Sequence, residues 1–225
     1  MICARQSVAG LGPLTDHGIR KGHGGERLDY EIVQNYGRGG LLWQFRNYLM
    51  TNIGLTQPPP EDDIMFHQSP PYKIVVSIMS SRQPTRNLTF LDQVRLLSQH
   101  LDPAKARVET HTMRDYPLRK QIEMVRNAAI YITGCGGGAV TATFLPRGAS
   151  LLIYYLEDGG YANNQRNYDP ARLDWDLFNH LGYVRTHWLG QNTMSTDDDQ
   201  NAFVQLIQHE LDFIQRQSNN QRPIE

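Results

Sequence analysis

A glycine cluster that follows an apolar, strand-like run is the stretch of the chain best suited to chemistry. Residues 130–138 read Ile-Tyr-Ile-Thr-Gly-Cys-Gly-Gly-Gly, and a short helix is expected over 139–145. Glycines let a backbone approach a ligand closely, and free N–H groups at the start of a helix bind phosphate. The spacing matches neither a P-loop nor the dinucleotide-binding fingerprint. Two interpretations stay open, tight packing of the strand against the helix or a phosphate loop formed by Gly134, Cys135, Gly136, Gly137 and Gly138.

A second candidate segment carries two arginines and follows a different predicted strand. Residues 80–86 read Ser-Ser-Arg-Gln-Pro-Thr-Arg, which places Ser81, Arg82 and Arg86 at the end of the strand expected over 73–80. Guanidinium groups bind phosphate oxygens bidentately, although a solvated loop with ordinary surface arginines would have the same composition. Two phosphate-compatible segments at the ends of two strands together favour a nucleotide or nucleotide-diphosphate ligand.

Three further side chains are weaker candidates for a catalytic base. His17 lies in a glycine-rich segment, where a surface histidine is the alternative interpretation, and Glu157 and Asp158 end a predicted strand, where a solvated turn is the alternative. Cys135 is a candidate nucleophile if a helix N-terminus favours its thiolate. No histidine stands near Cys135 in the sequence to activate it, so this remains the least supported role.

Composition excludes several classes of protein. The 225 residues carry a formal net charge of -1, which excludes a strongly cationic surface and argues against nucleic acid or an anionic membrane as the main partner. Two cysteines are too few for a disulfide scaffold or a cysteine-rich zinc site. The longest uncharged run, 127–146, is interrupted by the glycines and favours a turn over a membrane span, and residues 1–15 show no signal-peptide pattern. We therefore expect a soluble chain, or the soluble part of a larger one.

The elements that must position these residues alternate between strand and helix. Apolar or β-branched runs predict strands, and 3.6-residue periodicity predicts helices between them. This alternation predicts an α/β fold, a Rossmann-like, mainly parallel sheet flanked by helices, with its ligand site at the carboxyl ends of the strands. The strands are expected over 73–80, 107–112, 128–133, 150–156 and 183–188, and the helices over 88–101, 118–127, 139–145, 174–181 and from Ser195 or Thr196 to Gln217.

Three parts are expected along the chain. Residues 1–72 read as a lead-in with one helix over 41–53 and a proline-rich linker, 73–217 as a Rossmann-like nucleotide-binding lobe, and 218–225 as a disordered tail. Helical periodicity also predicts which side chains face the core. The predicted inward residues are Leu41, Leu42, Phe45, Tyr48 and Leu49 in the first helix, Leu91, Val94, Leu97 and Leu101 in the second, and Phe203, Ile207, Leu211 and Ile214 in the last.

The segments with candidate site residues resemble glycosyltransferase family 61. Residues 132–149, Ile-Thr-Gly-Cys-Gly-Gly-Gly-Ala-Val-Thr-Ala-Thr-Phe-Leu-Pro-Arg-Gly-Ala, are similar to that family's Gly-x-His-Gly-Ala-Gly segment and its Phe-Leu-Pro-x-Gly-Ala end. The helix before the glycine cluster and the Ser81-Arg82…Arg86 pattern resemble the family as well, so that the similarity covers roughly 73–188.

The resemblance implies an enzyme of GT-B architecture, built from two Rossmann-like lobes, whose C-terminal lobe binds a nucleotide-sugar donor. Such enzymes transfer the sugar with inversion of its anomeric configuration and need no metal or other cofactor. They glycosylate a hydroxyl of a glycan or glycoprotein. The implied location is the Golgi or endoplasmic reticulum lumen, through an anchor outside this chain. The resemblance further implies that Arg82, Arg86 and the N–H groups of 136–138 contact the donor diphosphate, with Cys135 beside the donor.

The chain departs from the family pattern at three places. Cys135 replaces the usual histidine, and Phe90 replaces an asparagine. The region around Ile153 and Tyr154, where the family usually has an acidic residue, is apolar here. These departures motivate the alternative of a degenerate, non-catalytic lobe that binds a glycan or a protein. A third hypothesis is a different Rossmann-like enzyme that uses Cys135 covalently. Because only about seventy residues precede the lobe, we expect the acceptor lobe to be missing or much reduced.

Overall fold

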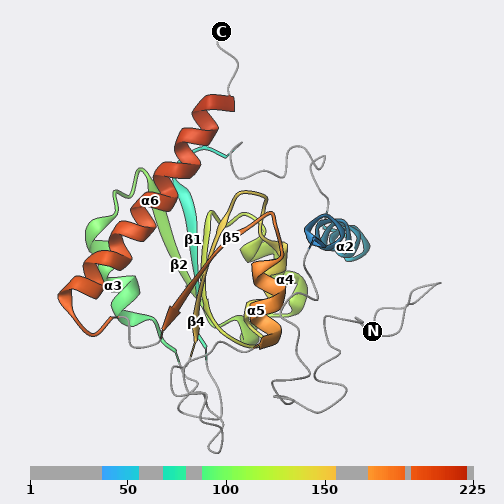
Figure 1. The fold of residues 1–225 in the computed structure, drawn as a ribbon, viewed down its shortest axis with the longest axis horizontal. Helices are drawn as coiled ribbons and strands as arrows, with labels where there is room; N and C mark the ends of the chain where they lie inside the picture. Colours follow the sequence, from blue (N-terminus) through green and yellow to red (C-terminus); the bar gives the residue numbers. More distant parts are fainter. Residues whose placement is uncertain (1–36, 56–67, 80–87, 156–171, 191–193, 222–225) are drawn as a thin grey trace, which may run out of the picture.

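The computed structural model describes residues 37–55, 68–79, 88–155, 172–190 and 194–221, and it confirms the predicted α/β fold. A five-stranded sheet lies at its centre, with the strand order β2-β1-β3-β4-β5 and every pair parallel (Figure 1). All five strands lie within a few residues of their predicted positions: β1 Tyr72–Ser77, β2 Ala106–His111, β3 Ile130–Gly134, β4 Ser150–Tyr155 and β5 Arg185–Gly190.

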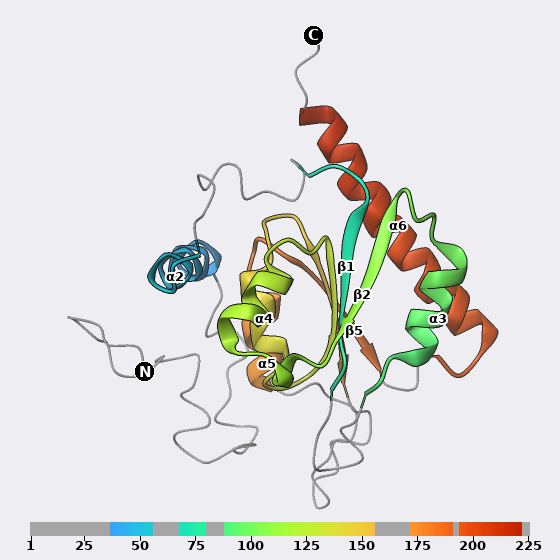
Figure 2. The same ribbon diagram turned by 180° about the vertical axis from the view of Figure 1, so that it is seen from behind.

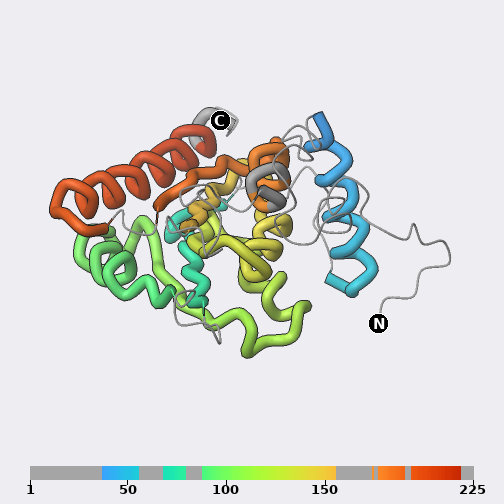
Figure 3. The backbone as a smooth tube through the Cα atoms, turned by 60° about the horizontal axis from the view of Figure 1, so that its bottom comes forward, coloured from blue at the N-terminus to red at the C-terminus, as the bar shows by residue number. Residues whose placement is uncertain are grey.

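Helices cover both faces of the sheet. On one side lie α3 (Leu91–His100) and α6 (Asp197–Gln221), and on the other α4 (Leu118–Val125), α5 (Arg172–Asn179) and the 3₁₀ helix η6 (Ala139–Phe144) (Figures 1 and 2). A view from below shows the two helix layers with the sheet between them and α2 (Gly39–Asn52) at the outer margin (Figure 3). A short 3₁₀ turn, η5 (Met113–Asp115), precedes α4. The helical layers explain why the central strands are apolar on both faces.

Side chains of the central strands alternate between the two layers. In β1, Ile74 and Val76 pack on the α3–α6 side, whereas Val75 packs on the α4–α5 side. The stripe predicted on the last helix is confirmed, since all four of its side chains are buried on the α3–α6 side. The predicted start of that helix is also confirmed: the Thr196 hydroxyl accepts the Asp199 N–H at 3.1 Å, and the Asp199 carboxylate accepts the Thr196 N–H at 3.0 Å.

The predicted buried face of the first helix is wrong at three of its positions. Leu41, Phe45 and Tyr48 are exposed, while Trp43 and Arg46 are buried. The Arg46 guanidinium lies 4.3 Å from the centroid of the Trp43 ring and donates to the Phe144 carbonyl at 3.0 Å, at the end of η6. A buried arginine with a carbonyl acceptor is invisible to a hydropathy pattern, so periodicity selected the wrong face of α2.

The second helix differs in a similar way, because Leu91 is exposed. Phe90 occupies the position before the helix with φ 56°, in the left-handed region that asparagine adopts more readily than phenylalanine. Its ring is buried against Tyr154, with centroids 5.2 Å apart. The Phe90 ring therefore fills the core position that the helical periodicity had assigned to Leu91.

Two helix ends also differ from expectation. The helix expected over 139–145 is the 3₁₀ helix η6, and α6 continues to Gln221, beyond the predicted end at Gln217. Ser218, in the segment predicted to be a disordered tail, is buried. The division of the chain into a lead-in and a lobe stays a prediction. In the part of the chain that the structure describes, every helix is too short or too polar to cross a lipid bilayer.

A buried polar cluster that the sequence did not predict joins α6 to the sheet. Glu210 of α6 accepts the Ser150 hydroxyl and the Arg185 Nε–H, the latter at 2.7 Å, and His187 Nε2 lies 3.2 Å from its other carboxylate oxygen. Burial alone would raise the pKa of Glu210. The hydrogen bonds from His187 and Ser150 and the charge of Arg185 instead lower it to about 2. The charged form of this carboxylate therefore stabilises the fold.

We predict that Glu210→Ala lowers the free energy of unfolding by about 3 kcal/mol, because it leaves Arg185 without its buried partner. Asp212→Ala is the matched control, since Asp212 is an exposed residue of the same helix whose surface ion pair with Lys105, before β2, contributes about 0–1 kcal/mol. Urea titrations at pH 7 measure both values. Equal losses in the two variants would contradict the assigned role of Glu210.

The same cluster predicts a pH dependence. Because the folded pKa of Glu210 is about 2 and its ordinary value is 4.5, its contribution is complete above 4.5 and is lost as the pH falls toward 2. Glu210→Gln removes this contribution, so its stability should change less than the parent's between pH 4.5 and 2. Parallel acid titrations followed by circular dichroism test the difference, and superimposable slopes would refute it.

Candidate ligand-binding site

The strand order places the topological switch point of the sheet between the carboxyl ends of β1 and β3. These two strands are neighbours, with Val76 paired to Ile132, although the chain visits β2 between them. From β1 the chain crosses to β2 through α3 on one face, whereas η6 after β3 lies on the other face. Connections that leave in opposite directions open a crevice, and parallel α/β sheets bind ligands at such switch points. The two candidate segments of the sequence follow these two strands.

The arginine-bearing segment has only its flanks in the described part of the chain. Ser81, Arg82 and Arg86 lie outside the described residues. On either side, Met79 and Leu88 form an antiparallel bridge with N···O distances of 2.9 and 3.2 Å. Their side chains pack over Gly134, where an added Cβ would lie 2.0 Å from Met79 Sδ and 2.8 Å from Leu88 Cδ1. The segment therefore leaves and returns beside the start of the glycine cluster.

The glycine cluster is a tight turn whose first amides are already hydrogen-bonded. The Cys135 N–H donates to the Tyr154 carbonyl at 2.8 Å, and the Gly136 N–H donates to Asp174 Oδ2 at 2.8 Å. Gly136 has φ +119°, which favours glycine, and the space around its Cβ position and that of Gly137 is open. Within the described residues, the N–H groups of Gly137 and Gly138 have no hydrogen-bond partner. These two amides are the loop's available donors.

Buried hydroxyls support the loop from beneath. The Gly138 carbonyl accepts the Tyr131 hydroxyl at 3.2 Å and the Thr141 hydroxyl at 2.8 Å, and these two hydroxyls lie 3.0 Å apart. Burial raises the pKa of Tyr131, although hydrogen bonds with Ser77, Thr141 and Thr133 oppose the rise. Tyr131 therefore stays a neutral phenol that fixes the end of the loop to strand β3.

Asp174 is the site residue that sequence reasoning missed. It stands in the first turn of α5 and is only 7% exposed. Burial raises the pKa of Asp174, and hydrogen bonds from the Gly136 N–H and the Cys135 thiol lower it. The sequence showed only an acidic residue near a helix start, a feature that is common at the helix dipole. No local signal connects it to a glycine 38 residues away.

The contact with Asp174 bears on the covalent hypothesis. A carboxylate beside a sulfur disfavours the thiolate, and the Cys135 thiol donates a hydrogen bond to this carboxylate. A six-residue 3₁₀ helix, rather than an α-helix, follows the cluster. The geometry therefore favours Cys135 as a structural hydrogen-bond donor over Cys135 as a nucleophile.

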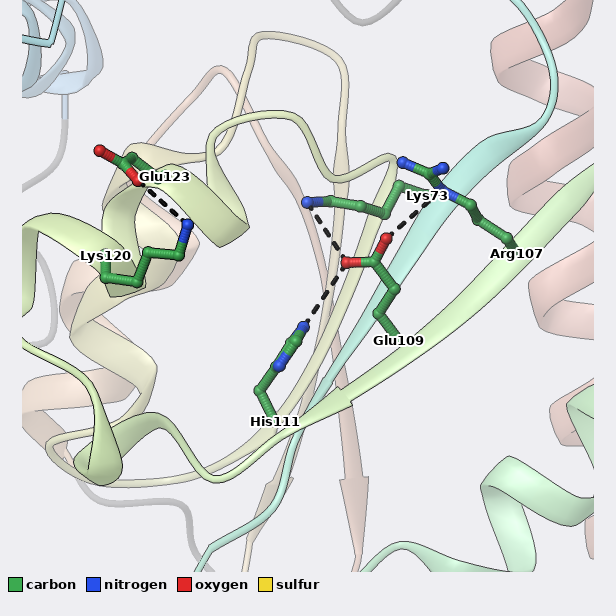
Figure 4. Close-up of polar contacts among 6 residues, drawn as sticks. All are labelled: Lys73, Arg107, Glu109, His111, Lys120 and Glu123. Atoms are coloured by element: carbon green, nitrogen blue, oxygen red, sulfur yellow. Dashed lines mark hydrogen bonds and ion pairs between the residues drawn. The ribbon is translucent and has the colours of Figure 1, made fainter.

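A second polar cluster lies on β1 and the edge strand β2. Three nitrogen-bearing side chains lie near the Glu109 carboxylate: Lys73 Nζ at 3.6 Å, Arg107 Nε at 3.4 Å and His111 Nε2 at 3.5 Å (Figure 4). Burial lowers the pKa of Lys73, whereas the charge of Glu109 raises it. Figure 4 shows these side chains converging on the carboxylate over the strands. The cluster holds the edge strand β2 to its neighbour β1. The Glu109 carboxylate thus has its partners within the protein.

The remaining candidates lie elsewhere. His17, Glu157 and Asp158 are outside the described residues. A polar groove of about 350 Å³ is lined by Gly54, Leu55, Arg119, Glu123, Arg126 and Asn127. Asn127 precedes β3, so this groove is at the amino end of the sheet and not at the switch point. Across the described ranges, no group of three or more histidine, cysteine or acidic residues is arranged to hold a metal ion.

Comparison with known proteins gives distant similarity to glycosyltransferases. No family model matches the chain. Bovine (Bos taurus) protein O-linked-mannose beta-1,4-N-acetylglucosaminyltransferase 2 is 26% identical over 137 residues, which cover 60% of this chain and 20% of the relative. The protein of the same name from Mus musculus is 28% identical over 88 residues, covering 39% of this chain and 14% of the relative. The chain thus matches a fifth or less of the length of each relative. At this low identity, the chain is glycosyltransferase-like.

The glycines of the loop are predicted to respond differently to alanine. Gly134→Ala should lower the free energy of unfolding by about 1–3 kcal/mol, because its Cβ collides with Met79 and Leu88. Gly137→Ala meets open space and should change stability by less than about 0.5 kcal/mol. Thermal denaturation of both variants checks the contrast. A Gly134→Ala protein as stable as Gly137→Ala would show that the flanks of the arginine segment do not pack there.

Proposed function

We propose that this chain is the donor-binding lobe of a nucleotide-sugar-dependent glycosyltransferase. The observation that carries the proposal is the loop at the end of β3, beside the flanks of an arginine-bearing segment at the switch point. Among the described residues, nothing accepts a hydrogen bond from the Gly137 and Gly138 amides of this loop. The two glycosyltransferase relatives support the same class of reaction. The enzyme would transfer a sugar to a hydroxyl of a glycan or glycoprotein, with inversion and without a metal ion.

The chemistry requires positive charge and hydrogen-bond donors for the leaving group. As the glycosidic bond to the donor breaks, negative charge develops on the nucleoside diphosphate, and preorganised donors stabilise that charge. In the proposed complex, Arg82 and Arg86 contact the diphosphate, Ser81 contributes a hydroxyl, and Gly137 and Gly138 donate their N–H groups. Cys135 lies beside the donor without taking part in bond formation.

The acceptor hydroxyl must lose its proton to a base as it attacks. Asp174 does not suit this role, because its carboxylate is buried and already accepts two hydrogen bonds. His17, Glu157 and Asp158 remain the proposed bases. The relatives' name specifies N-acetylglucosamine and O-linked mannose, so we propose a UDP-N-acetylglucosamine donor and a mannose-bearing glycopeptide acceptor as the first substrates to test. A Golgi or endoplasmic reticulum location belongs to the same proposal.

One observation favours the alternative of a non-catalytic binding lobe. Cys135 replaces the family's histidine and donates to Asp174, so the loop itself offers no imidazole for proton transfer. The two functions differ in turnover. Transfer to a mannose-bearing glycopeptide, or hydrolysis of UDP-N-acetylglucosamine above the uncatalysed rate, supports the transferase. Binding of the donor without either reaction supports the binding lobe.

Calorimetric titration with UDP, GDP and UDP-N-acetylglucosamine tests the donor site. We expect UDP to bind, and Arg82→Ala or Arg86→Ala to weaken binding about tenfold or more, because each removes a charge-assisted contact. Arg95→Ala, an exposed arginine on α3, is the matched control and should leave affinity unchanged. Chelation of divalent metal with EDTA should also leave it unchanged. Absence of binding by all three ligands at millimolar concentration would overturn the proposed donor site.

A further inference from the structure

Asp174 joins two connections that leave neighbouring strands. The glycine cluster follows β3, whereas Asp174 stands near the start of α5, between β4 and β5. Its carboxylate lies beneath the cluster, 7% exposed, and accepts the Gly136 N–H at 2.8 Å and the Cys135 thiol. Its carboxylate therefore joins the first half of the cluster to α5 by hydrogen bonds.

The direction of the Gly136 amide determines which backbone N–H groups of the loop remain available as hydrogen-bond donors. With φ +119° and its N–H committed to Asp174, Gly136 turns the chain so that the Gly136 carbonyl accepts the Ala139 N–H at 2.9 Å. The Tyr131 and Thr141 hydroxyls hold the other end of the turn at the Gly138 carbonyl. Between these two anchors, the amides of Gly137 and Gly138 remain without partners in the described part of the chain.

We propose that Asp174 is the positioning residue of the diphosphate site: its carboxylate holds Gly136 and Cys135 so that the Gly137 and Gly138 amides remain available to a phosphate group. The ligand in this inference rests on the proposed function, whereas the anchoring of the loop does not. Asp174 does not touch the ligand. It acts through the loop, and removal of its acceptor oxygen leaves a part-buried N–H unsatisfied and releases the turn.

Two variants separate the hydrogen bond from the charge. Asp174→Ala removes the acceptor, whereas Asp174→Asn keeps a side-chain carbonyl oxygen for the Gly136 N–H and removes the charge. Asp198→Ala is the matched control, because Asp198 is an exposed carboxylate in the first turn of another helix, α6. Leu211→Ala serves as a second control: it destabilises the core on the opposite face of the sheet without touching the loop.

Two measurements report on the loop independently. UDP affinity, measured by calorimetry below the melting temperature of every variant, should fall about tenfold in Asp174→Ala and stay within about threefold of the parent in Asp174→Asn. The rate at which iodoacetamide alkylates Cys135, resolved from Cys3 by peptide mass spectrometry, should rise about tenfold in Asp174→Ala because the loop opens. Both controls should retain the parent's affinity and alkylation rate.

The outcomes distinguish this inference from the donor-site proposal. If the parent binds no nucleotide, the proposed function fails, and the alkylation rates alone decide whether Asp174 anchors the loop. Parent-like affinity and alkylation in Asp174→Ala would overturn the positioning role. An equal loss of affinity in Asp174→Asn and Asp174→Ala would also overturn it, because charge rather than hydrogen-bond geometry would then be responsible. Rapid alkylation in Leu211→Ala would show that general destabilisation opens the loop.

Discussion

The reversal of strand order between β1 and β3 is the constraint from which the site follows. A parallel sheet that is apolar on both faces must be covered on both, so the chain has to send α3 to one side and η6 and α5 to the other. The helices that follow β1 and β3, α3 and η6, lie on opposite faces of the sheet. The loops that leave these two strands therefore border the switch point, where the proposed ligand site lies.

The glycine cluster shows how closely packing and ligand binding are combined. Position 134 requires a glycine because the side chains of Met79 and Leu88 lie over it. Gly136 has a positive φ, and the space around the Cβ position of Gly137 is open. The two interpretations of the cluster that the sequence left open therefore apply to different residues. Tight packing accounts for Gly134, and the proposed phosphate contacts fall to Gly137 and Gly138.

Apolar patterns predicted the five strands, the sheet type and the burial of Phe203, Ile207, Leu211 and Ile214, because those features depend on local periodicity. The patterns failed where a polar side chain takes a buried place through a distant partner. Arg46 is buried on α2 because the Phe144 carbonyl accepts its guanidinium, and Glu210 is buried because residues of β4 and β5 surround it. Asp174 belongs to the same class, and its partner lies 38 residues away. Such pairs form only when the chain folds, so the residue spacing within one segment does not predict them.

An amide NMR titration of the glycine-labelled protein with UDP tests the proposed diphosphate site most directly. The Gly137 and Gly138 resonances should shift saturably, as phosphate oxygens accept their N–H groups, and the Gly136 resonance should move little because its N–H stays on Asp174. The contradicting result is a titration to millimolar UDP in which Gly137 and Gly138 keep their free positions, or in which the shifts gather instead at the groove beside Gly54.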